Sequence, residues 1–303
     1  MLAACSGRPA WRSASGAIWG TAYHITYEAP ADLCDSILIV LDSVGESLSM
    51  WSPTSTVSRI NAGASDSVDA FFAEVFGVSQ AVAQASAGRF DPTVAPLVDL
   101  WGFGRRGADV AAPDSAMIAE ALAKVGILKC SVNNGRIHKA NPATEFDFSA
   151  VAKGFGVDRV AQMLARNGAR NFMVEIGGEI RLAGHNPAGK TWRIQIDAPV
   201  EGSAPGDSAF RFLTLTDCAI ATSGNYRSFN THGGHTINPV TGHPAGRQIA
   251  SATVVAPDCA LADAIATALM ASPPDSAQAI LAPFPGVTAL LILPDNTSVQ
   301  IPE

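Results

Sequence analysis

The chain of 303 residues lacks the features that mark several large protein classes. It has 20 Lys and Arg against 27 Asp and Glu, and no run of basic residues. This argues against nucleic acid or an anionic membrane surface as the main partner. No stretch of 18 apolar residues occurs, so we expect no membrane-spanning helix. The five cysteines include no CxxC pair, so a zinc site is not expected.

What is present is a large apolar fraction and an unusual N-terminus. Hydrophobic residues make up 48% of the chain, enough for a large core in one domain or two tightly joined lobes. The start, Leu2-Ala3-Ala4-Cys5, resembles the lipobox of bacterial lipoproteins, although the charged and apolar parts of a signal peptide are missing; a chance match in an Ala-rich chain is the alternative. We therefore predict a disordered leader remnant over 1–17, a functional domain over 18–303 and a periplasmic location, with Cys5 as the lipid-bearing residue.

Hydrophobic periodicity predicts an α+β fold, with mixed sheets flanked by helices. Strands and helices alternate without a strict βαβ order, which argues against a doubly wound sheet. We expect a hairpin over 127–138 that turns at Asn133-Asn134-Gly135. Predicted helices cover 33–50, 68–87, 114–125, 149–168, 258–271 and 276–281. Predicted strands cover 21–28, 171–176, 192–197, 210–216, 219–222, 251–256, 287–293 and 298–301.

The segment Asp258–Ala271 is the most informative because it predicts a buried helix with one acid. Asp263 and Thr267 lie four residues apart, so a carboxylate and a hydroxyl point from the same helical face into an apolar interior. A buried carboxylate needs a cation or several donors, and this helix contains no Lys or Arg. Mg²⁺ bound by these oxygens and by phosphate is one explanation. The alternative is that Asp263 accepts backbone amides while Thr267 bonds to its own helix.

Two further segments suit a planar, phosphate-bearing ligand. Residues 88–104 are rich in Pro and Gly and predict a rigid loop able to offer Phe90 and backbone amides, unless its aromatic residues simply pack inward. Residues 147–154 predict a helix start, where free amides and the positive end of the helix dipole bind anions. Lys153 would reach a phosphate there, although Asp147 or Ser149 serving as an ordinary helix cap explains the same pattern.

Two segments carry weaker signals. Gly177-Gly178 at a strand end allows close approach of a backbone or ligand, but more often such a pair only turns the chain. Residues 219–244 hold three of the six histidines. No GxSxG elbow accompanies them, and their spacing fits no standard zinc pattern. A single histidine acting as a general base or phosphate donor fits this segment better.

Together these segments resemble the ApbE family, the FAD:protein FMN transferases. The resemblance extends over nearly the whole chain and is carried by seven segments in order. They are LSMWSPTSTVSRIN (48–61), GRFDPTVAPLVDLWGFG (88–104), DFSAVAKGFGVDRVA (147–161), NFMVEIGGEIRLAG (171–184), AIATSGNYR (219–227), HTINPVTGHP (235–244) and ADAIATAL (262–269).

This resemblance implies an ApbE-like, T-fold-related architecture and a specific activity. Family members use Mg²⁺ and transfer FMN from FAD onto a Thr or Ser hydroxyl of an acceptor protein, releasing AMP. The acceptor carries an Asp-x-Ser/Thr-Gly-Ala-Ser/Thr-like motif, as in subunits of respiratory flavoproteins. Members are exported and often lipid-anchored, which agrees with the pattern around Cys5.

The resemblance also assigns roles to individual residues. It implies that Asp263, Thr267 and the backbone oxygen of Ala150 hold Mg²⁺, and that His235 is the catalytic base. Members often have two consecutive histidines at that point, whereas here Gly234 precedes a single one. The residues that match FAD contacts are Trp19, Trp51, Arg89, Phe90, Asp91, Asp147, Lys153 and Ile237.

Two other functions share the same site. An FAD pyrophosphatase would use water in place of the acceptor hydroxyl and give free FMN and AMP. A non-catalytic FAD-binding lipoprotein that serves assembly of a respiratory complex would hold FAD without turnover. The sequence does not name the acceptor protein.

Overall fold

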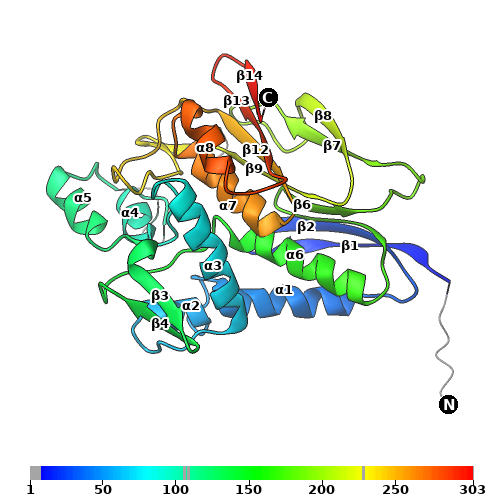
Figure 1. Ribbon diagram of the computed structural model, residues 1–303, viewed down its shortest axis with the longest axis horizontal. Helices are drawn as coiled ribbons and strands as arrows, with labels where there is room; N and C mark the ends of the chain where they lie inside the picture. Colours follow the sequence, from blue (N-terminus) through cyan, green and yellow to red (C-terminus); the bar gives the residue numbers. More distant parts are fainter. Residues whose placement is uncertain (1–7, 105–106, 108–109, 227–228, 303) are drawn as a thin grey trace.

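The computed structural model describes residues 8–302 apart from 105–106, 108–109 and 227–228. At its centre lies an eight-stranded sheet in which every neighbouring pair is antiparallel (Figure 1). The predicted α+β class is therefore confirmed. In spatial order the strands are β1 (Ala10–Ile18), β2 (Thr21–Ala29), β5 (Asn171–Ile176), β6 (Glu179–Ala183), β9 (Ala219–Gly224), β12 (Ser251–Ala256), β13 (Thr288–Ile292) and β14 (Ser298–Ile301).

Helices cover one face of this sheet. Figure 1 shows α6 and α7 side by side, with α1 and α3 outside them, and α7 also contacts β9 and β12 directly. The helices are α1 (Cys34–Leu48), α2 (Thr56–Asn61), α3 (Ala70–Ala85), α4 (Ala95–Leu100), α5 (Ser115–Leu122), α6 (Ala152–Arg166), α7 (Cys259–Met270) and α8 (Ala277–Leu281), with short 3₁₀ turns η1 (Ile127–Lys129) and η2 (Pro274–Ser276).

Small strand pairs complete the fold. The pair β7 (Trp192–Asp197) and β8 (Ala209–Leu215) packs on the sheet face opposite the helices, where Trp192 and Ile194 meet Leu182 and Ile220. The others are β3 (Cys130–Asn133) with β4 (Arg136–Lys139), and β10 (Phe229–Asn230) with β11 (Gly233–Gly234).

Helix α7 is the centre of the hydrophobic core. Every residue of this helix except Leu261 and Thr267 is buried, and its alanines allow neighbouring elements to approach closely because each adds only a methyl group. Gly154 of α6 makes the closest approach. A Cβ on Gly154 would lie 2.7 Å from the Cys259 carbonyl carbon and 2.9 Å from the Ala260 nitrogen. The two helices therefore touch backbone to backbone at this glycine.

A buried acid fixes the start of α7. The carboxylate of Asp158, on α6, accepts the N–H groups of Cys259 and Ala260 at 3.0 and 2.9 Å. These are amides of the first helical turn, which have no partner within their own helix. Arg181 of β6 bonds both Asp158, at 3.0 Å, and Asp258, at 3.2 Å. Burial raises the pKa of Asp158 to about 6, against the opposing effect of these donors.

Most predicted elements are confirmed, with their ends displaced by a few residues. The 258–271 helix is α7, and the predicted hairpin turn joins β3 to β4 at Asn134 and Gly135. Helix α2, helix α4 and strand β6, each of five or six residues, were not predicted.

Two predictions need correction. Residues 10–18, most of which were assigned to the leader, form β1 and pair with β2 along their whole length. Residues 13–17 are small (Ser, Ala, Ser, Gly, Ala) and give no apolar alternation. Pairing with β2 at the sheet edge orders the strand instead. Ser149 does not cap α6: its hydroxyl bonds Asp147 at 2.5 Å, and the helix begins at Ala152 without a side-chain cap.

Among the described residues, every helix is too short or too polar to cross a bilayer. Cys34, Cys130, Cys218 and Cys259 are all free thiols. Cys5, the residue predicted to carry the lipid, lies outside the described residues.

The contact at Gly154 predicts an asymmetric response to alanine substitution. Gly154→Ala should lower the free energy of unfolding by about 1–3 kcal/mol, because its methyl group overlaps the backbone of α7. Gly77→Ala, in α3 where a Cβ meets nothing within 4 Å, should raise it by roughly 0.5–1 kcal/mol through the better helix propensity of alanine. Urea unfolding of both variants measures the difference. Equal effects of the two changes would contradict the account of the α6–α7 contact.

Candidate functional site

The site is built around the buried carboxylate of Asp263. Its side chain is 4% exposed and lies against the N-terminal turn of α6. There Asp263 Oδ2 accepts the Gly154 N–H at 3.1 Å and lies 3.8 Å from Lys153 Nζ. The helix-to-helix contact at Gly154 therefore also sets the position of this acid.

The structure revises the sequence argument about Asp263. The prediction that its own helix offers no cation holds, but Lys153 of α6 supplies one from 110 positions earlier in the chain. Spacing along one helix cannot reveal a partner on another. A metal is therefore not needed merely to neutralise the charge of Asp263. The metal assignment rests instead on the oxygen atoms near Asp263 that can still bind a cation.

Glu179, which the sequence reasoning did not single out, belongs to the same cluster. Its side chain is 4% exposed, and its Oε2 lies 2.9 Å from Lys153 Nζ. Two buried carboxylates thus share one ammonium, and the cluster carries a formal charge of −1. The sequence offered one signal for this position, the Gly177-Gly178 pair directly before Glu179. In the structure both glycines adopt a positive φ, a conformation that favours glycine.

The pKa values of the cluster follow from burial and mutual charge. Burial raises the pKa of Asp263, and Lys153 and the Gly154 amide oppose this effect. Burial also raises the pKa of Glu179, against the attraction of Lys153. For Lys153 burial acts downward, but Asp263 and Glu179 outweigh it and the pKa is raised. Lys153 therefore stays charged at neutral pH.

The donors around Asp263 fit a hard cation. The described contacts of the carboxylate both involve Oδ2, which leaves Oδ1 for a further partner. One turn along α7, Thr267 Oγ1 lies 3.3 Å from the Ser223 hydroxyl of β9. No described backbone N–H donates to the Ala150 carbonyl, the third predicted ligand. Within the described chain no three His, Cys, Asp or Glu side chains cluster, so any cation here takes mainly hydroxyl, carbonyl and phosphate oxygens, as Mg²⁺ does.

Two predicted aromatic contacts have different surroundings. Trp19 forms the turn between β1 and β2 with a φ of 49°. A Cβ at Gly156 of α6 would collide with its indole ring, and a Cβ at Gly45 of α1 would lie 3.3 Å from the indole nitrogen. Trp51 follows α1 and is 67% exposed. Trp19 is therefore held by its packing, whereas Trp51 offers a free aromatic face to a ligand.

The predicted contacts at 89–91 are largely internal. Phe90 is buried in the main core cluster. Asp91 accepts the Thr93 N–H, the Thr93 hydroxyl and the Ile127 N–H, at 2.8, 2.6 and 2.9 Å. Arg89 is partly exposed. Of the three, Arg89 has the side chain best placed to meet a ligand, and Phe90 and Asp91 shape the loop that carries it.

The loop of 147–150 is tied to the same region. The Asp147 N–H donates to the Pro92 carbonyl at 2.6 Å, which joins the two predicted flavin-contacting segments. The Asp147 carboxylate accepts the N–H and hydroxyl of Ser149. This closes a tight turn immediately before Ala150, and the turn leads into α6 and Lys153.

The predicted base lies in the loop between β11 and β12. His235 is exposed, whereas its neighbour Ile237 is buried against Leu97 and Trp101. The other two histidines of this segment, His232 and His243, pack against Trp101 with ring centroids 5.8 and 5.5 Å away. His235 is therefore accessible to a ligand, whereas His232 and His243 lie against Trp101.

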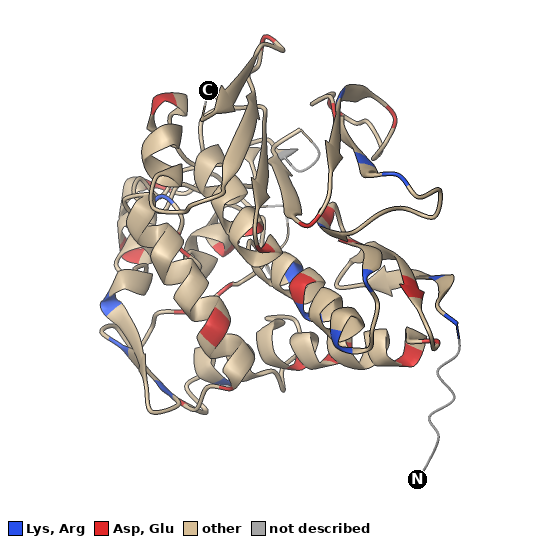
Figure 2. Cartoon of the chain, turned by 45° about the vertical axis from the view of Figure 1, so that its right-hand side comes forward, with Lys and Arg blue, Asp and Glu red and all other residues tan. Residues whose placement is uncertain are grey.

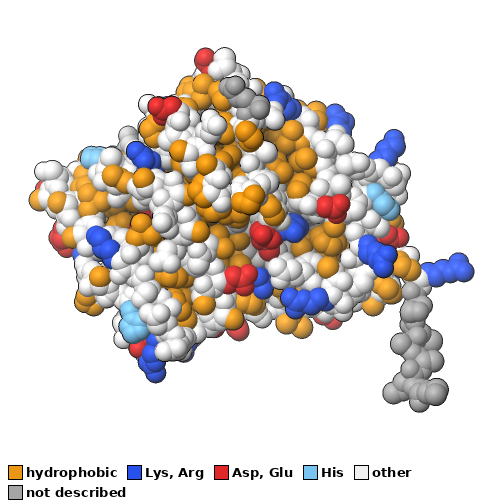
Figure 3. Space-filling view, in the orientation of Figure 1, with side chains coloured by type: hydrophobic (Ala, Val, Ile, Leu, Met, Phe, Trp, Pro, Cys, Tyr) orange, Lys and Arg blue, Asp and Glu red, His pale blue; other side chains and the backbone are white. Residues whose placement is uncertain are grey.

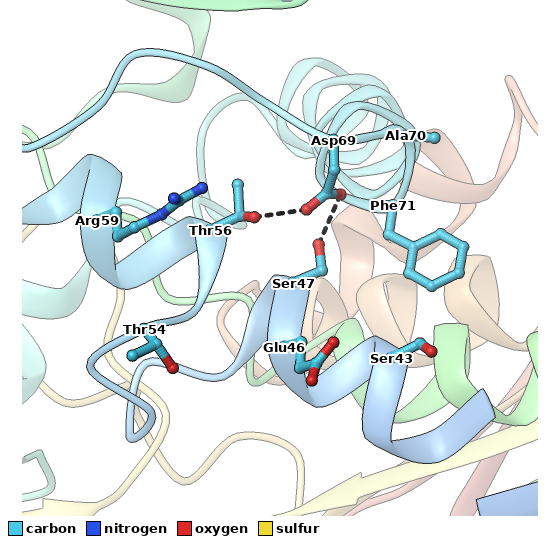
Figure 4. Close-up of a pocket in the computed structure, with 9 residues that line it drawn as sticks. All are labelled: Ser43, Glu46, Ser47, Thr54, Thr56, Arg59, Asp69, Ala70 and Phe71. Atoms are coloured by element: carbon cyan, nitrogen blue, oxygen red, sulfur yellow. Dashed lines mark hydrogen bonds between the residues drawn. The ribbon is translucent and has the colours of Figure 1, made fainter. Parts of the chain in front are cut away.

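A pocket of about 550 Å³ lies elsewhere, between α1, α2 and α3. It includes none of the predicted site residues. Figure 4 shows Asp69 pointing toward Ser47 and Thr56, whose hydroxyls it accepts at 2.7 and 2.6 Å. It also accepts the Phe72 N–H at the start of α3. The polar groups of the cavity therefore join three helices, and we assign it a structural role.

Acidic and basic residues are interspersed along the elements drawn in Figure 2. The face drawn in Figure 3 is a mosaic of apolar, polar and charged side chains, with acidic and basic groups adjacent near its centre.

Comparison with known proteins connects this geometry to a family. The pattern that defines the ApbE family matches residues 19–291. An FAD:protein FMN transferase of Haemophilus influenzae is 34% identical over 97% of this chain and 90% of its own. The flavin transferase ApbE from Vibrio cholerae superposes with a TM-score of 0.86, at 33% identity over 96% of each chain. The Pseudomonas stutzeri flavinyl transferase ApbE, in its apo form, gives 0.84 at 28% identity over 97% and 96%.

The hydrogen bonds that Asp69 accepts from Ser47, Thr56 and Phe72 predict its effect on stability. Asp69→Ala should lower the free energy of unfolding by about 1–2 kcal/mol at pH 7, because α3 loses its cap and two hydroxyls lose their acceptor. Asp114→Ala is the matched control, since Asp114 caps α5 through a single hydrogen bond to the Met117 N–H, and should cost less.

The effect of Asp69→Ala should depend on pH. Burial acts to raise the pKa of Asp69, but the bonds from Thr56, Phe72 and Ser47 outweigh it and the pKa is lowered. A lowered folded-state pKa gives stability above the unfolded value of about 3.9, which is lost as the pH falls further. Denaturant unfolding at pH 7 and pH 3 should show the wild-type advantage shrinking in acid; a growing advantage would contradict this.

Proposed function

The chain belongs to the ApbE family, and from this premise we propose that it is an FAD:protein FMN transferase, the activity named for its relatives in Haemophilus influenzae and Vibrio cholerae. It would move FMN from FAD to a Thr or Ser hydroxyl of an acceptor protein and release AMP. The observation that supports this most directly is a buried acid, Asp263, with one carboxylate oxygen still open beside Lys153 and Thr267.

The chemistry is an in-line displacement at phosphorus. The acceptor oxygen forms a bond to the FMN phosphorus while the bond from that phosphorus to the bridging oxygen breaks, and the bridging oxygen leaves with AMP. Catalysis of this type rests on alignment and on cations near the oxygens that gain charge. Lys153, which stays charged, is a fixed cation at the rim of the site and would contact a phosphate oxygen.

The remaining residues bind or move a proton. Asp263, Thr267 and the Ala150 carbonyl would hold Mg²⁺, which acts as a Lewis acid on the phosphates when bound. His235 would accept the proton of the acceptor hydroxyl through its exposed imidazole. Trp51 would lie against a ring of the dinucleotide, and Arg89 would contact the same ligand. The acceptor would carry the Asp-x-Ser/Thr-Gly-Ala-Ser/Thr-like motif of respiratory flavoprotein subunits.

Export to the periplasm with a lipid on Cys5 remains a prediction from the sequence alone. Mass spectrometry of the N-terminal peptide from producing cells tests it, since an unmodified Cys5 behind a Met1 start would contradict it.

Product analysis tests the proposed reaction. Incubation with FAD, Mg²⁺ and an acceptor domain should give a UV-fluorescent acceptor band and an equal amount of AMP. Asp263→Asn should reduce both products by a factor of about 10² or more, because loss of a preorganised charge contact costs roughly 2.7–4 kcal/mol in the transition state. Asp258→Asn is the matched control: this acid starts the same helix, is 62% exposed, and should leave the rate near that of the wild type.

The alternatives give different products. Fast release of FMN and AMP without acceptor would identify an FAD pyrophosphatase. Stoichiometric FAD retention with no product would identify a non-catalytic binding protein. A wild-type rate for Asp263→Asn would refute the metal role.

The base assignment predicts a separation of binding from turnover. His235→Gln should lower kcat by about 10²- to 10⁴-fold, the usual contribution of a positioned general base, and leave FAD affinity unchanged. His243→Gln, an exposed histidine eight positions along the same loop, should retain near wild-type kcat. Flavin fluorescence titration and AMP release measure the two quantities. An unchanged kcat in His235→Gln would assign the proton transfer to another group.

A further inference from the structure

Glu179 has no part in the reaction as derived above, yet it is among the most buried charges of the described chain. Its side chain is 4% exposed, and apart from Lys153 no donor to its Oε2 atom is described. Its one described ion pair is the contact with Lys153 Nζ at 2.9 Å. A buried acid with a single ionic partner is costly unless its position serves a purpose.

The purpose follows from the distances within the cluster. Lys153 Nζ lies 2.9 Å from Glu179 Oε2 but 3.8 Å from Asp263 Oδ2. A lysine without Glu179 would move onto Asp263, the nearest other acid, and would compete with any cation for that carboxylate. Glu179 therefore holds the ammonium closer to itself than to Asp263.

The backbone keeps Glu179 in this place. It is the first residue of β6, after the tight Gly177-Gly178 turn, and pairs across the hairpin with Ile176. The Gly178 N–H donates to Glu175 Oε1 at 2.7 Å, which braces the turn from the preceding strand. A strand and a braced turn fix the carboxylate more firmly than a loop would.

We propose that Glu179 is a positioning residue, which holds Lys153 away from Asp263 and so keeps Asp263 open to a divalent cation. This inference rests on the proposed function, because it assumes that Asp263 is a metal ligand. Glu179 acts through Lys153 and touches neither the cation nor the substrate.

Cation binding without turnover tests the proposal. Calorimetric titration of the full chain with Mg²⁺ should show Glu179→Gln binding about 10-fold more weakly or worse, the usual effect of losing a group that orients a metal ligand. Glu179→Asp keeps the charge but shortens the side chain by one carbon, and should also weaken binding. Normal affinity in Glu179→Asp with loss in Glu179→Gln would mean that only charge matters and would overturn the positioning role.

A double-variant cycle separates position from charge. In a Lys153→Met background no ammonium remains to be held, so adding Glu179→Gln should change the Mg²⁺ Kd by less than about twofold. A second large loss in that background would show that Glu179 acts on the cation directly and would overturn the proposal.

The control lies in the same hairpin. Glu175→Gln removes the charge of an acid that pairs with the exposed His24 at 2.7 Å and not with Lys153. Its amide oxygen can still accept the Gly178 N–H, so the Mg²⁺ Kd should stay unchanged. A loss equal to that of Glu179→Gln would mean that the hairpin fold, and not Lys153, is responsible. Absence of Mg²⁺ binding by the wild type would overturn the metal role itself, whereas an unchanged Kd in Glu179→Gln would overturn only the positioning role.

Discussion

The close contact of α6 with α7 at Gly154 is the constraint on which the site depends. Without a Cβ there, the first turns of both helices meet at backbone distance. The Gly154 amide then reaches Asp263, and the residue before it, Lys153, reaches the same carboxylate. Asp158, one turn further along α6, holds the first amides of α7. One face of α6 therefore fixes both the start of α7 and its buried acid.

This arrangement explains why charge is gathered where the core is most apolar. Helix α7 consists mainly of small side chains and is buried on nearly all sides. Its acid, Asp263, therefore depends on partners from other elements. Strand β6 supplies Glu179 and Arg181 on the sheet face that meets α6. Two clusters, each of two acids and one basic residue, thus lie side by side. The cluster at the start of α7 is Asp158, Asp258 and Arg181, and the other is Asp263, Glu179 and Lys153. Both carboxylate oxygens of Asp158 accept backbone amides of α7, whereas the described contacts of Asp263 involve Oδ2 alone.

The sequence predicted the elements better than the contacts between them. The α7 helix, with Asp263 and Thr267 on one face, could be predicted because helical periodicity is a local property. The approach of Lys153 could not, since it depends on how two distant helices pack around one glycine. Glu179 was missed for the same reason, and β1 was missed because its small residues lack an apolar alternation. For Asp91 the motif match implies a ligand contact, which stays a prediction, and its described bonds hold the loop itself.

The proposed role of Asp263 is to bind a metal next to the phosphates of the dinucleotide. A crystal structure of the protein with FAD and Mn²⁺ tests this role through the anomalous signal of the metal. We expect one strong anomalous peak in contact with Asp263, Thr267 and the Ala150 carbonyl, close to the FAD phosphates. A peak remote from Asp263, or FAD phosphates bound with no peak near that carboxylate, would contradict it.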